Sequence, residues 1–293
     1  MSLSDNAVDD QANTRADDKA HNRAHWDEMA PRWMAWWERY GPASQPVSDW
    51  LVAQAKVSPG ARVLDLATGL GEPALSFARA VGPQGLVLGV DQSAQMIAFA
   101  RERAQAEGLE QLRFAIQDVE ALELAHEQPF DALVSRWGLM FCTDLTVTLE
   151  RMRSLLKADG RLVAAVWSEA RAVPLLSLAG QVLQQSLGID MSRPGPGPFT
   201  LADPEGLRNS LQAAGFVVEA LETVDVSLLY PSAPEYLKDR CQTSPLLESI
   251  LADLQPEQRQ HFDAALAAAL EPWRQGDHLK LVNKALCVSC RLA

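Results

Sequence analysis

The sequence has few cysteines and a shortage of positive charge. Its 293 residues include four cysteines, and 26 Lys and Arg stand against 38 Asp and Glu, for a formal net charge of −12. Four scattered cysteines do not form the disulfide framework of a small secreted protein, so we expect a cytoplasmic one. An acidic protein repels phosphate backbones, and nucleic acid is therefore not an expected partner.

Long apolar runs and metal-ligand clusters are also missing. No uncharged apolar segment approaches the length that crosses a bilayer, so no membrane span is expected. Cys287 and Cys290 are the one close pair of thiols, but their surroundings are typical of a β-strand, and no second ligand pair accompanies them. We therefore expect no metal.

What remains is a chain with 47% hydrophobic residues, enough for one large α/β domain. Strand-like and helix-like segments alternate along most of its length. This alternation predicts a doubly wound, mostly parallel sheet with helices on both faces.

Aromatic residues gather near the N-terminus. Trp26, Met29, Trp33, Trp36 and Trp37 have the spacing of one face of a helix. Such a helix either anchors itself on the domain through large aromatic side chains or forms the wall of a ligand pocket. Both interpretations remain open at this point.

A glycine turn follows the first expected strand. Residues 62–67 form a short apolar strand, Gly69 and Gly71 follow it, and the next helix ends at Gly82. Glycines in such a turn let the backbone approach a ligand closely.

Acidic residues end the next two expected strands. Asp91 follows the strand over 85–90, and Asp118 and Val119 follow the strand over 112–116. A carboxylate in the first of these positions can accept hydrogen bonds from both hydroxyls of a ribose, which indicates an adenosine-containing ligand.

The glycine turn also fits the looser fingerprint of a dinucleotide site, so an NAD-dependent oxidoreductase is an alternative. Asp65 and Glu72 count against it, because carboxylates beside the turn disfavour a pyrophosphate and favour a cationic sulfonium with an ammonium group. Asp65 has a second interpretation, as a structural carboxylate that caps local N–H groups.

Five segments, taken in order, resemble a known family. VLDLATGLGEPAL (63–75), GVDQSAQM (89–96), QDVEAL (117–122), FDALVSRWGLMF (130–141) and LKADGRLVAAVW (156–167) resemble motifs of the class I S-adenosylmethionine-dependent methyltransferases, within them the UbiE-like small-molecule group. The resemblance implies a seven-stranded Rossmann-like methyltransferase sheet with helical lid insertions and an antiparallel edge. It implies S-adenosylmethionine as the cofactor.

The resemblance also implies an arrangement of segments. A helical arm over 1–50 would cover the site, and residues 51–168 would form the cofactor-binding core. Residues 169–293 would complete the sheet with strands near 216–228 and 284–291. Their helices, at about 170–200 and 231–276, would form a lid over the acceptor.

Most of the residues expected to contact the cofactor lie in the matched motifs, and Trp33 of the aromatic helix is added to them. The candidates are Trp33, Asp65, Ala67, Thr68, Gly69, Gly71, Asp91, Gln92, Met96, Asp118, Val119 and Arg136. One departs from the pattern, because the first glycine of the family's turn is Ala67 here. We expect its methyl group to be tolerated on the condition that the backbone stays out of the left-handed region.

The acceptor is expected to be a small apolar or aromatic metabolite, such as a quinone, phenol or polyketide-like compound, methylated on oxygen, carbon or nitrogen. Trp37, Trp137, Met140 and Phe141 are the candidates that contact it. Methyl transfer depends chiefly on alignment, and His25 is the candidate base where one is needed. A methyltransferase fold that catalyses another reaction is a further alternative, and the oligomeric state is open, with a homodimer among the options.

Overall fold

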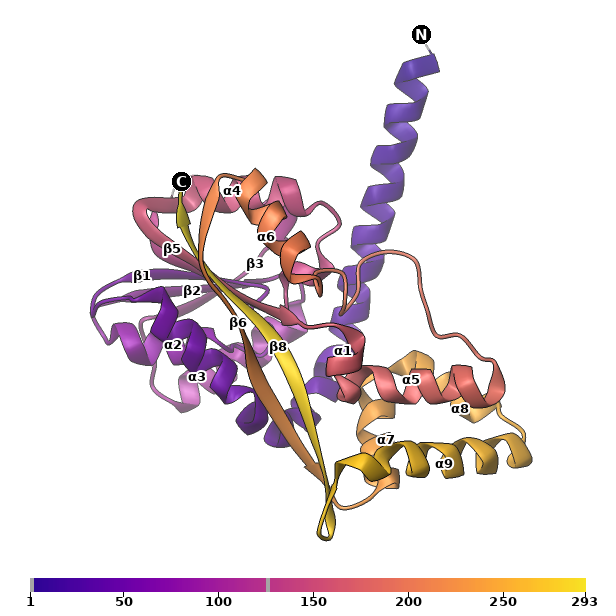
Figure 1. The fold of residues 1–293 in the computed structure, drawn as a ribbon. Coiled ribbons are helices and arrows are strands. Elements are labelled where there is room, and N and C mark those ends of the chain that lie inside the picture. The colour runs from indigo at the N-terminus through magenta and orange to yellow at the C-terminus, as the bar shows by residue number, and fades with distance from the viewer. Residues whose placement is uncertain (1–2, 125–126) are drawn as a thin grey trace.

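A mixed sheet forms the centre of the computed structural model, which describes residues 3–124 and 127–293 (Figure 1). Its strand order is β3-β2-β1-β4-β5-β8-β6, with the short β7 paired to β8. The strands are β1 (Arg62–Leu66), β2 (Leu86–Asp91), β3 (Leu112–Ile116), β4 (Phe130–Arg136), β5 (Leu156–Trp167), β6 (Phe216–Tyr230), β7 (Arg274–Gln275) and β8 (His278–Leu292).

The first five strands run parallel, whereas β8 is antiparallel to both β5 and β6. The predicted fold class, a doubly wound and mostly parallel sheet with an antiparallel edge, is therefore confirmed. The late strands are longer than the ranges expected from the sequence, because β6 and β8 pair along their lengths, from Phe216 with Leu292 to Tyr230 with Leu279.

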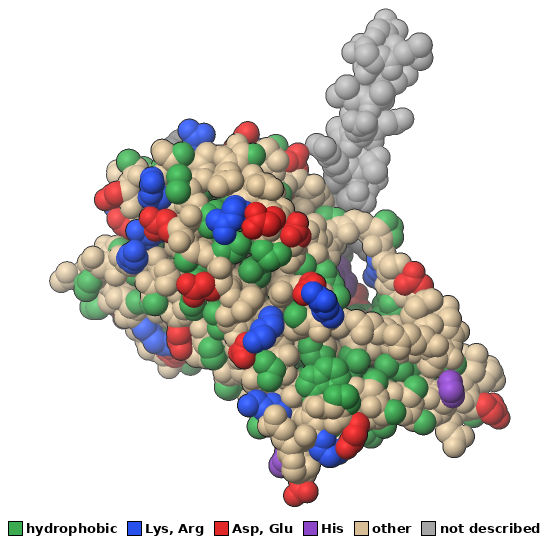
Figure 2. All heavy atoms as spheres, viewed as in Figure 1, with side chains coloured by type: hydrophobic (Ala, Val, Ile, Leu, Met, Phe, Trp, Pro, Cys, Tyr) green, Lys and Arg blue, Asp and Glu red, His purple; other side chains and the backbone are tan. Residues whose placement is uncertain are grey.

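Helices cover both faces of the sheet, with α2 and α3 on one side and α4 and α6 on the other (Figure 1). The α-helices are α1 (Leu3–Ala55), α2 (Ala74–Val81), α3 (Ala94–Ala106), α4 (Leu145–Leu155), α5 (Pro174–Leu187), α6 (Pro204–Ala213), α7 (Ala233–Thr243), α8 (Pro245–Asp253) and α9 (Pro256–Leu270). Short 3₁₀ turns lie at η1 (Val119–Ala121), η2 (Leu139–Phe141), η3 (Ala170–Ala172) and η4 (Glu271–Trp273). On the face shown in Figure 2, acidic and basic side chains are interspersed.

Burial on both faces explains the composition of the parallel strands. In β1 every residue after Arg62 is buried, and Asp65 is its only carboxylate. Cys287 and Cys290 lie buried in β8 as free thiols, and burial raises the pKa of each to about 12. These thiols are therefore protonated and unreactive, as their strand context predicts.

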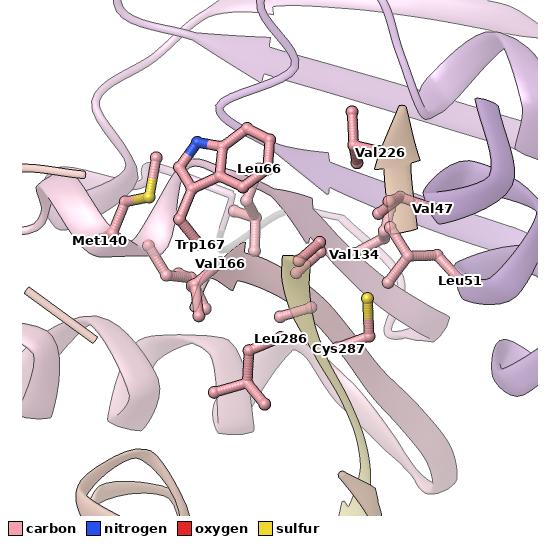
Figure 3. Close-up of a cluster of buried hydrophobic side chains, with 14 of the residues drawn as sticks. Val47, Leu51, Leu66, Val134, Met140, Val166, Trp167, Val226, Leu286 and Cys287 are labelled. Atoms are coloured by element: carbon pink, nitrogen blue, oxygen red, sulfur yellow. The ribbon is translucent and has the colours of Figure 1, made fainter. Parts of the chain in front are cut away.

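Helix α1 packs across the sheet as well as against α3 and α7. Its side chains Val47 and Leu51 are fully buried near Val134 and Cys287 of the sheet (Figure 3). On α7, Asp239 accepts hydrogen bonds from Trp36 Nε1 at 2.8 Å and Arg39 Nη1 at 3.0 Å. Trp36 is thus an anchor of α1, in line with the packing interpretation of the aromatic helix.

A buried amide joins α5 to the paired strands β6 and β8. Asn283 Oδ1 accepts from the backbone N–H of Leu175 at 2.8 Å, and its Nδ2 donates to the carbonyls of Val226 at 3.0 Å and Leu281 at 3.3 Å. A buried amide with its hydrogen bonds satisfied fixes the first turn of α5 relative to the sheet.

The change Asn283→Ala is expected to lower the free energy of unfolding by about 2–4 kcal/mol, because it leaves buried backbone groups without partners. Urea denaturation followed by circular dichroism measures the effect. Lys284→Ala, which removes the neighbouring exposed ion pair with Asp225, serves as the control and is expected to change stability by about 0–1 kcal/mol. Equal losses in the two variants would contradict the assignment.

Candidate active site

The carboxyl ends of β1, β2, β3 and β4 lie side by side. Asp65 is in register with Gly89 of β2 and with Val134 of β4. Between β2 and β3, the backbone N–H of Gln117 donates to the carbonyl of Asp91 at 2.9 Å. The predicted site residues at these strand ends are therefore neighbours in space, as the crevice of an open α/β sheet requires.

The glycine turn and Asp91 are held together directly. Asp91 Oδ2 accepts from the N–H of Gly69 at 2.9 Å, and Oδ1 accepts from the N–H of Ser93 at 2.9 Å. Gly71, at φ +94°, is closed in, because a Cβ there would lie 2.5 Å from Leu75 Cδ1. A Cβ on Gly69 would meet nothing within 4 Å, so the turn presents open space on the Gly69 side.

The expectation for Ala67 was wrong. Its φ is +56°, inside the left-handed region that disfavours a side chain. The methyl group is accommodated by its neighbour instead, since a Cβ on Gly138 would lie only 2.6 Å from Ala67 Cβ. Trp137, beside that glycine, is also left-handed at φ +61°. Two strained residues that are not glycine thus adjoin at this edge, as often occurs at functional sites.

Asp65 is fully buried, and only one of its oxygens is bonded. Oδ2 accepts from Thr68 Oγ1 at 2.6 Å and from the N–H of Ala74 at 3.0 Å, whereas Oδ1 has no partner among the described residues. Burial raises the pKa of this carboxyl to about 7, against the hydrogen bonds and the charge of Arg136, which lower it. The capping interpretation accounts for Oδ2, and the unpartnered Oδ1 suits a cation such as the ammonium group of S-adenosylmethionine.

Trp37 lies over the glycine turn. The guanidinium of Arg103 stacks on its ring at 4.3 Å from the centroid and donates to the carbonyl of Leu70. Gly41 gives the ring its space, because a Cβ there would lie 2.7 Å from it. Arg103 is also 3.8 Å from the buried carboxylate of Glu72.

Trp33 and Met96 belong to a small apolar cluster over the same turn. Ala30, Leu70 and Met96 form its buried centre, and Trp33 and Trp37 pack against it. The structure therefore brings these predicted contacts together, and α1 is the element that covers the glycine turn.

The expected adenine side lies at the end of β3. Asp118 caps the turn η1, with Oδ1 accepting from the N–H of Glu120 at 2.9 Å. Asp118, Val119 and Gln92 are half-buried. Their contacts with an adenine stay a prediction.

One residue of α1 that the sequence analysis missed reaches the start of α3. Asp27 Oδ1 accepts from Ser93 Oγ at 2.6 Å and from the N–H of Gln95 at 3.2 Å. Helix α1 thereby crosses the edge where Asp91 lies.

At the end of β4, Arg136 is 7% exposed. Its Nη1 donates to Ser48 Oγ of α1 at 2.7 Å and approaches Ser44 Oγ at 3.4 Å. Trp137 stacks on Trp167 with centroids 4.6 Å apart.

The remaining predicted acceptor residues occupy different surroundings. Phe141 is half-buried, and its ring lies 5.3 Å from that of Trp26. Met140 is 2% exposed and packs in the core (Figure 3). His25 is half-buried beside Trp26 at 5.6 Å. Their roles toward a substrate stay predictions.

Tyr40, Ser44 and Ser48 are further residues near the strand ends that the sequence analysis missed. They continue the helical spacing of Trp33 and Trp37 at intervals of three and four residues. That spacing was the available signal, but the predicted pattern ended at Trp37. In addition, α1 contains Pro42 and Pro46, and prolines at these positions in a sequence predict a break in a helix.

Metal-binding clusters and membrane-spanning helices are both absent from the described part of the chain. No group of three or more His, Cys, Asp or Glu side chains that could hold a metal ion occurs within residues 3–124 and 127–293. Over the same ranges, no helix combines the length and apolar character of a membrane span.

Comparisons with known proteins agree with this geometry. Residues 57–192 match the family model described as a methyltransferase domain. A 2-phytyl-1,4-naphtoquinone methyltransferase of Trichormus variabilis is 34% identical over 42% of this chain and 59% of its own length. A ubiquinone/menaquinone biosynthesis C-methyltransferase UbiE of Xanthomonas axonopodis is 36% identical over 46% of this chain and 50% of its own.

The chain thus matches between half and three fifths of the length of these two relatives. Among solved structures, the YcgJ protein of Bacillus subtilis superposes with a TM-score of 0.55 at 18% identity, over 84% of this chain and 98% of its own, which supports the fold. Residues 57–192, a little under half of this chain, match a methyltransferase domain, as the resemblance to methyltransferases predicts. The same match supports the predicted cofactor.

The change Ala67→Gly is expected to raise the free energy of unfolding by up to about 1 kcal/mol, because relief of the left-handed strain exceeds the added freedom of the unfolded chain. Ala164→Gly in the ordinary strand β5 is the control and is expected to destabilise by about 1 kcal/mol. Chemical denaturation of both variants measures the difference. A loss of stability in Ala67→Gly would show that its packing on Gly138 outweighs the strain.

The pKa of Asp65 predicts a pH-dependent cofactor affinity. A cation beside Oδ1 favours the ionised carboxylate, so affinity for S-adenosylmethionine is expected to rise with pH up to about 7 and then level off. Calorimetry in two buffers of different ionisation enthalpy should detect proton release at pH 7. Asp65→Asn should bind more weakly and remove that release, whereas an unchanged release would assign the proton to another group.

The raised pKa of Asp65 also makes the free energy of unfolding depend on pH. Because the pKa of Asp65 is higher in the folded protein than its usual 3.8, the contribution of this carboxyl to stability is complete at low pH and is lost as the pH rises to about 7.

Proposed function

We propose that this protein transfers a methyl group from S-adenosylmethionine to a small aromatic or apolar acceptor. The observation that carries the proposal is the buried Asp65, whose Oδ1 is unpartnered among the described residues and whose Oδ2 is bonded to Thr68 in the turn before Gly69. Asp91 lies on the next strand, where a ribose would be bound. A cation attached to an adenosine satisfies both carboxylates.

Each group near the turn has a role in this proposal. Asp65 and the backbone around Gly69 would hold the methionine part, and Asp91 would accept from the ribose hydroxyls. Asp118 and Val119 would flank the adenine. When bound, the cofactor supplies an electrophilic methyl group on its sulfonium. The chain itself then needs to align the acceptor and exclude water, which can account for most of the acceleration of such a displacement.

Helix α1 and the late helices would enclose the acceptor. Trp37 lies by the glycine turn under the guanidinium of Arg103, Trp137 follows β4 beside Tyr40, and Phe141 lies next to Trp26. The group of α5, α7, α8 and α9 would form the lid, because these helices pack on one another beside the sheet. Flat aromatic walls suit a flat acceptor.

The relatives support quinone-like acceptors as the first compounds to test, since both are named for quinone methylation. The family match ends at residue 192 and therefore omits α7, α8 and α9. The acceptor class is for this reason inferred from the aromatic walls together with the relatives. The position of the methyl group in the product would show whether oxygen, carbon or nitrogen is methylated.

An NAD-dependent oxidoreductase is the weaker alternative. Both Asp65 and Glu72 are buried within the turn region, where a pyrophosphate would be repelled. A protein of this fold that catalyses another reaction would share the whole cofactor site. Detection of a methylated product separates that alternative from the proposed one.

The change Asp91→Ala is expected to weaken S-adenosylmethionine binding by about 100-fold or more, because two charge-assisted hydrogen bonds to a ribose are lost. Calorimetric titration measures it, and NADH should give no heat of binding with the wild-type protein. Asp225→Ala, on the exposed part of β6, is the matched control that keeps full affinity.

Because Asp91 also holds the N–H groups of Gly69 and Ser93, the thermal unfolding of each variant is recorded alongside. A folded Asp91→Ala protein with unchanged affinity would refute the assigned ribose site. Binding of NADH in place of S-adenosylmethionine would refute the proposed function. Incubation of the wild-type protein with methyl-labelled cofactor and a panel of quinols and phenols, read by mass spectrometry, tests the reaction itself.

A further inference from the structure

Arg136 is a buried cation without a counter-ion in contact. Its side chain is held by the neutral hydroxyls of Ser48 and Ser44 and by the faces of two indoles, those of Trp137 at 4.9 Å and Trp37 at 5.9 Å. Within the described residues no carboxylate lies within ion-pair distance of it, although Glu72, Tyr40 and Asp65 act on it electrostatically. Buried charges are ordinarily paired, so this arrangement suits an anion.

Two N–H groups here are buried and have no acceptor in the part of the chain that the structure describes. They are Nε of Arg136 and Nε1 of Trp137. The two side chains are in contact through the guanidinium-on-indole stack. Buried donors without acceptors cost free energy unless a ligand satisfies them, and these two belong to neighbouring side chains at the end of β4.

The backbone is strained at the same point. Trp137 is held at φ +61° while its N–H donates to the carbonyl of Ala165 at 2.7 Å and its ring stacks on Trp167. Strain of this kind persists where the surrounding structure fixes a side chain for use. The ring of Tyr40, 5.6 Å from that of Trp137, adds an aromatic neighbour.

We propose that Arg136 and Trp137 form an oxyanion subsite, which binds the ionised oxygen of an aromatic acceptor. The proposal rests on the proposed function, and it narrows the acceptor to phenols, hydroquinones and related enols that carry an acidic hydroxyl at or beside the methylated atom. Arg136 supplies the charge and Nε, and Trp137 supplies Nε1, while the ring of Trp137 is itself held between Trp167 and the guanidinium of Arg136.

The chemistry of such an acceptor balances without another reactant. The ionised oxygen, or the ring carbon beside it, supplies the electron pair of the new bond to the methyl carbon, and the carbon–sulfur bond breaks with its pair left on sulfur. When oxygen is methylated no proton remains to be removed. When the ring carbon is methylated, the proton on that carbon is released to solvent.

The subsite can be tested with 4-nitrophenol, whose ionised form absorbs visible light. Wild-type protein saturated with S-adenosylhomocysteine is expected to bind the ionised form about tenfold or more tightly than the neutral form, as a pair of charge-assisted hydrogen bonds implies. The absorbance of the bound probe across a pH series gives this preference directly. 4-Nitroanisole, which lacks the ionisable oxygen, is the neutral control compound.

Trp137→Phe removes Nε1 while keeping a ring in the stack, and Arg136→Gln removes the charge. Each is expected to reduce the preference for the ionised probe severalfold, whereas Trp167→Phe, which changes the other indole of the stack, keeps it. If the Arg136→Gln protein does not fold, the Trp137→Phe variant alone tests the subsite. No preference in the wild-type protein, or an unchanged preference in Trp137→Phe, would overturn the subsite.

The carboxylate of the cofactor is the other source of an oxyanion. If Arg136 binds that group, Arg136→Gln will weaken S-adenosylhomocysteine but not 5′-methylthioadenosine, which lacks the amino acid part, and will leave the probe unaffected. That result would overturn the acceptor assignment. A wild-type protein that prefers the ionised probe yet binds no S-adenosylhomocysteine would instead refute the proposed function and leave the oxyanion subsite standing.

Discussion

The hydrogen bond between Ser48 Oγ and the buried guanidinium of Arg136 joins α1 to the end of β4. Through this bond the long N-terminal helix becomes part of the strand-end site. The other contacts follow from its position, since Trp37 can then lie over the glycine turn and Asp27 can reach the first turn of α3. Without α1, Trp37 and the cover of the turn would both be missing.

At the strand ends, Ala67 and Gly138 approach each other so closely that only one of the two can carry a Cβ. The methyl group of Ala67 occupies the space that a Cβ on Gly138 would need. Ala67 is therefore compatible with the fold only because residue 138 is glycine. The left-handed Ala67 meets Gly138, the neighbour of the left-handed Trp137, so the turn after β1 and the loop after β4 are fitted to each other.

The strand ends could be predicted from the sequence because parallel strands have a strong local signature. Short apolar runs end in Asp91 or Asp118, and each is followed by turn residues, so local pattern was enough to bring these carboxylates together. The backbone angle of Ala67 was not predictable in this way, because it depends on Gly138, about seventy residues away in the chain. Ser48 was missed for the same reason, since only tertiary structure shows that a serine on a helical face meets Arg136.

The distribution of charged side chains determines which reactants this site would favour. The negative groups, Asp65 and Glu72, lie on the β1 side, and the uncompensated cation Arg136 lies on the β4 side. A cationic methyl donor placed on the first side and an anionic acceptor on the second would each find the opposite charge. Transfer of the methyl group neutralises both reactants, so the separated charges of the ground state disappear as the bond forms. A dry, aromatic enclosure favours that loss of charge, because poorly solvated ions gain most by neutralising one another. The tryptophans of α1 would then act on the reaction through the low polarity they impose as well as through contact.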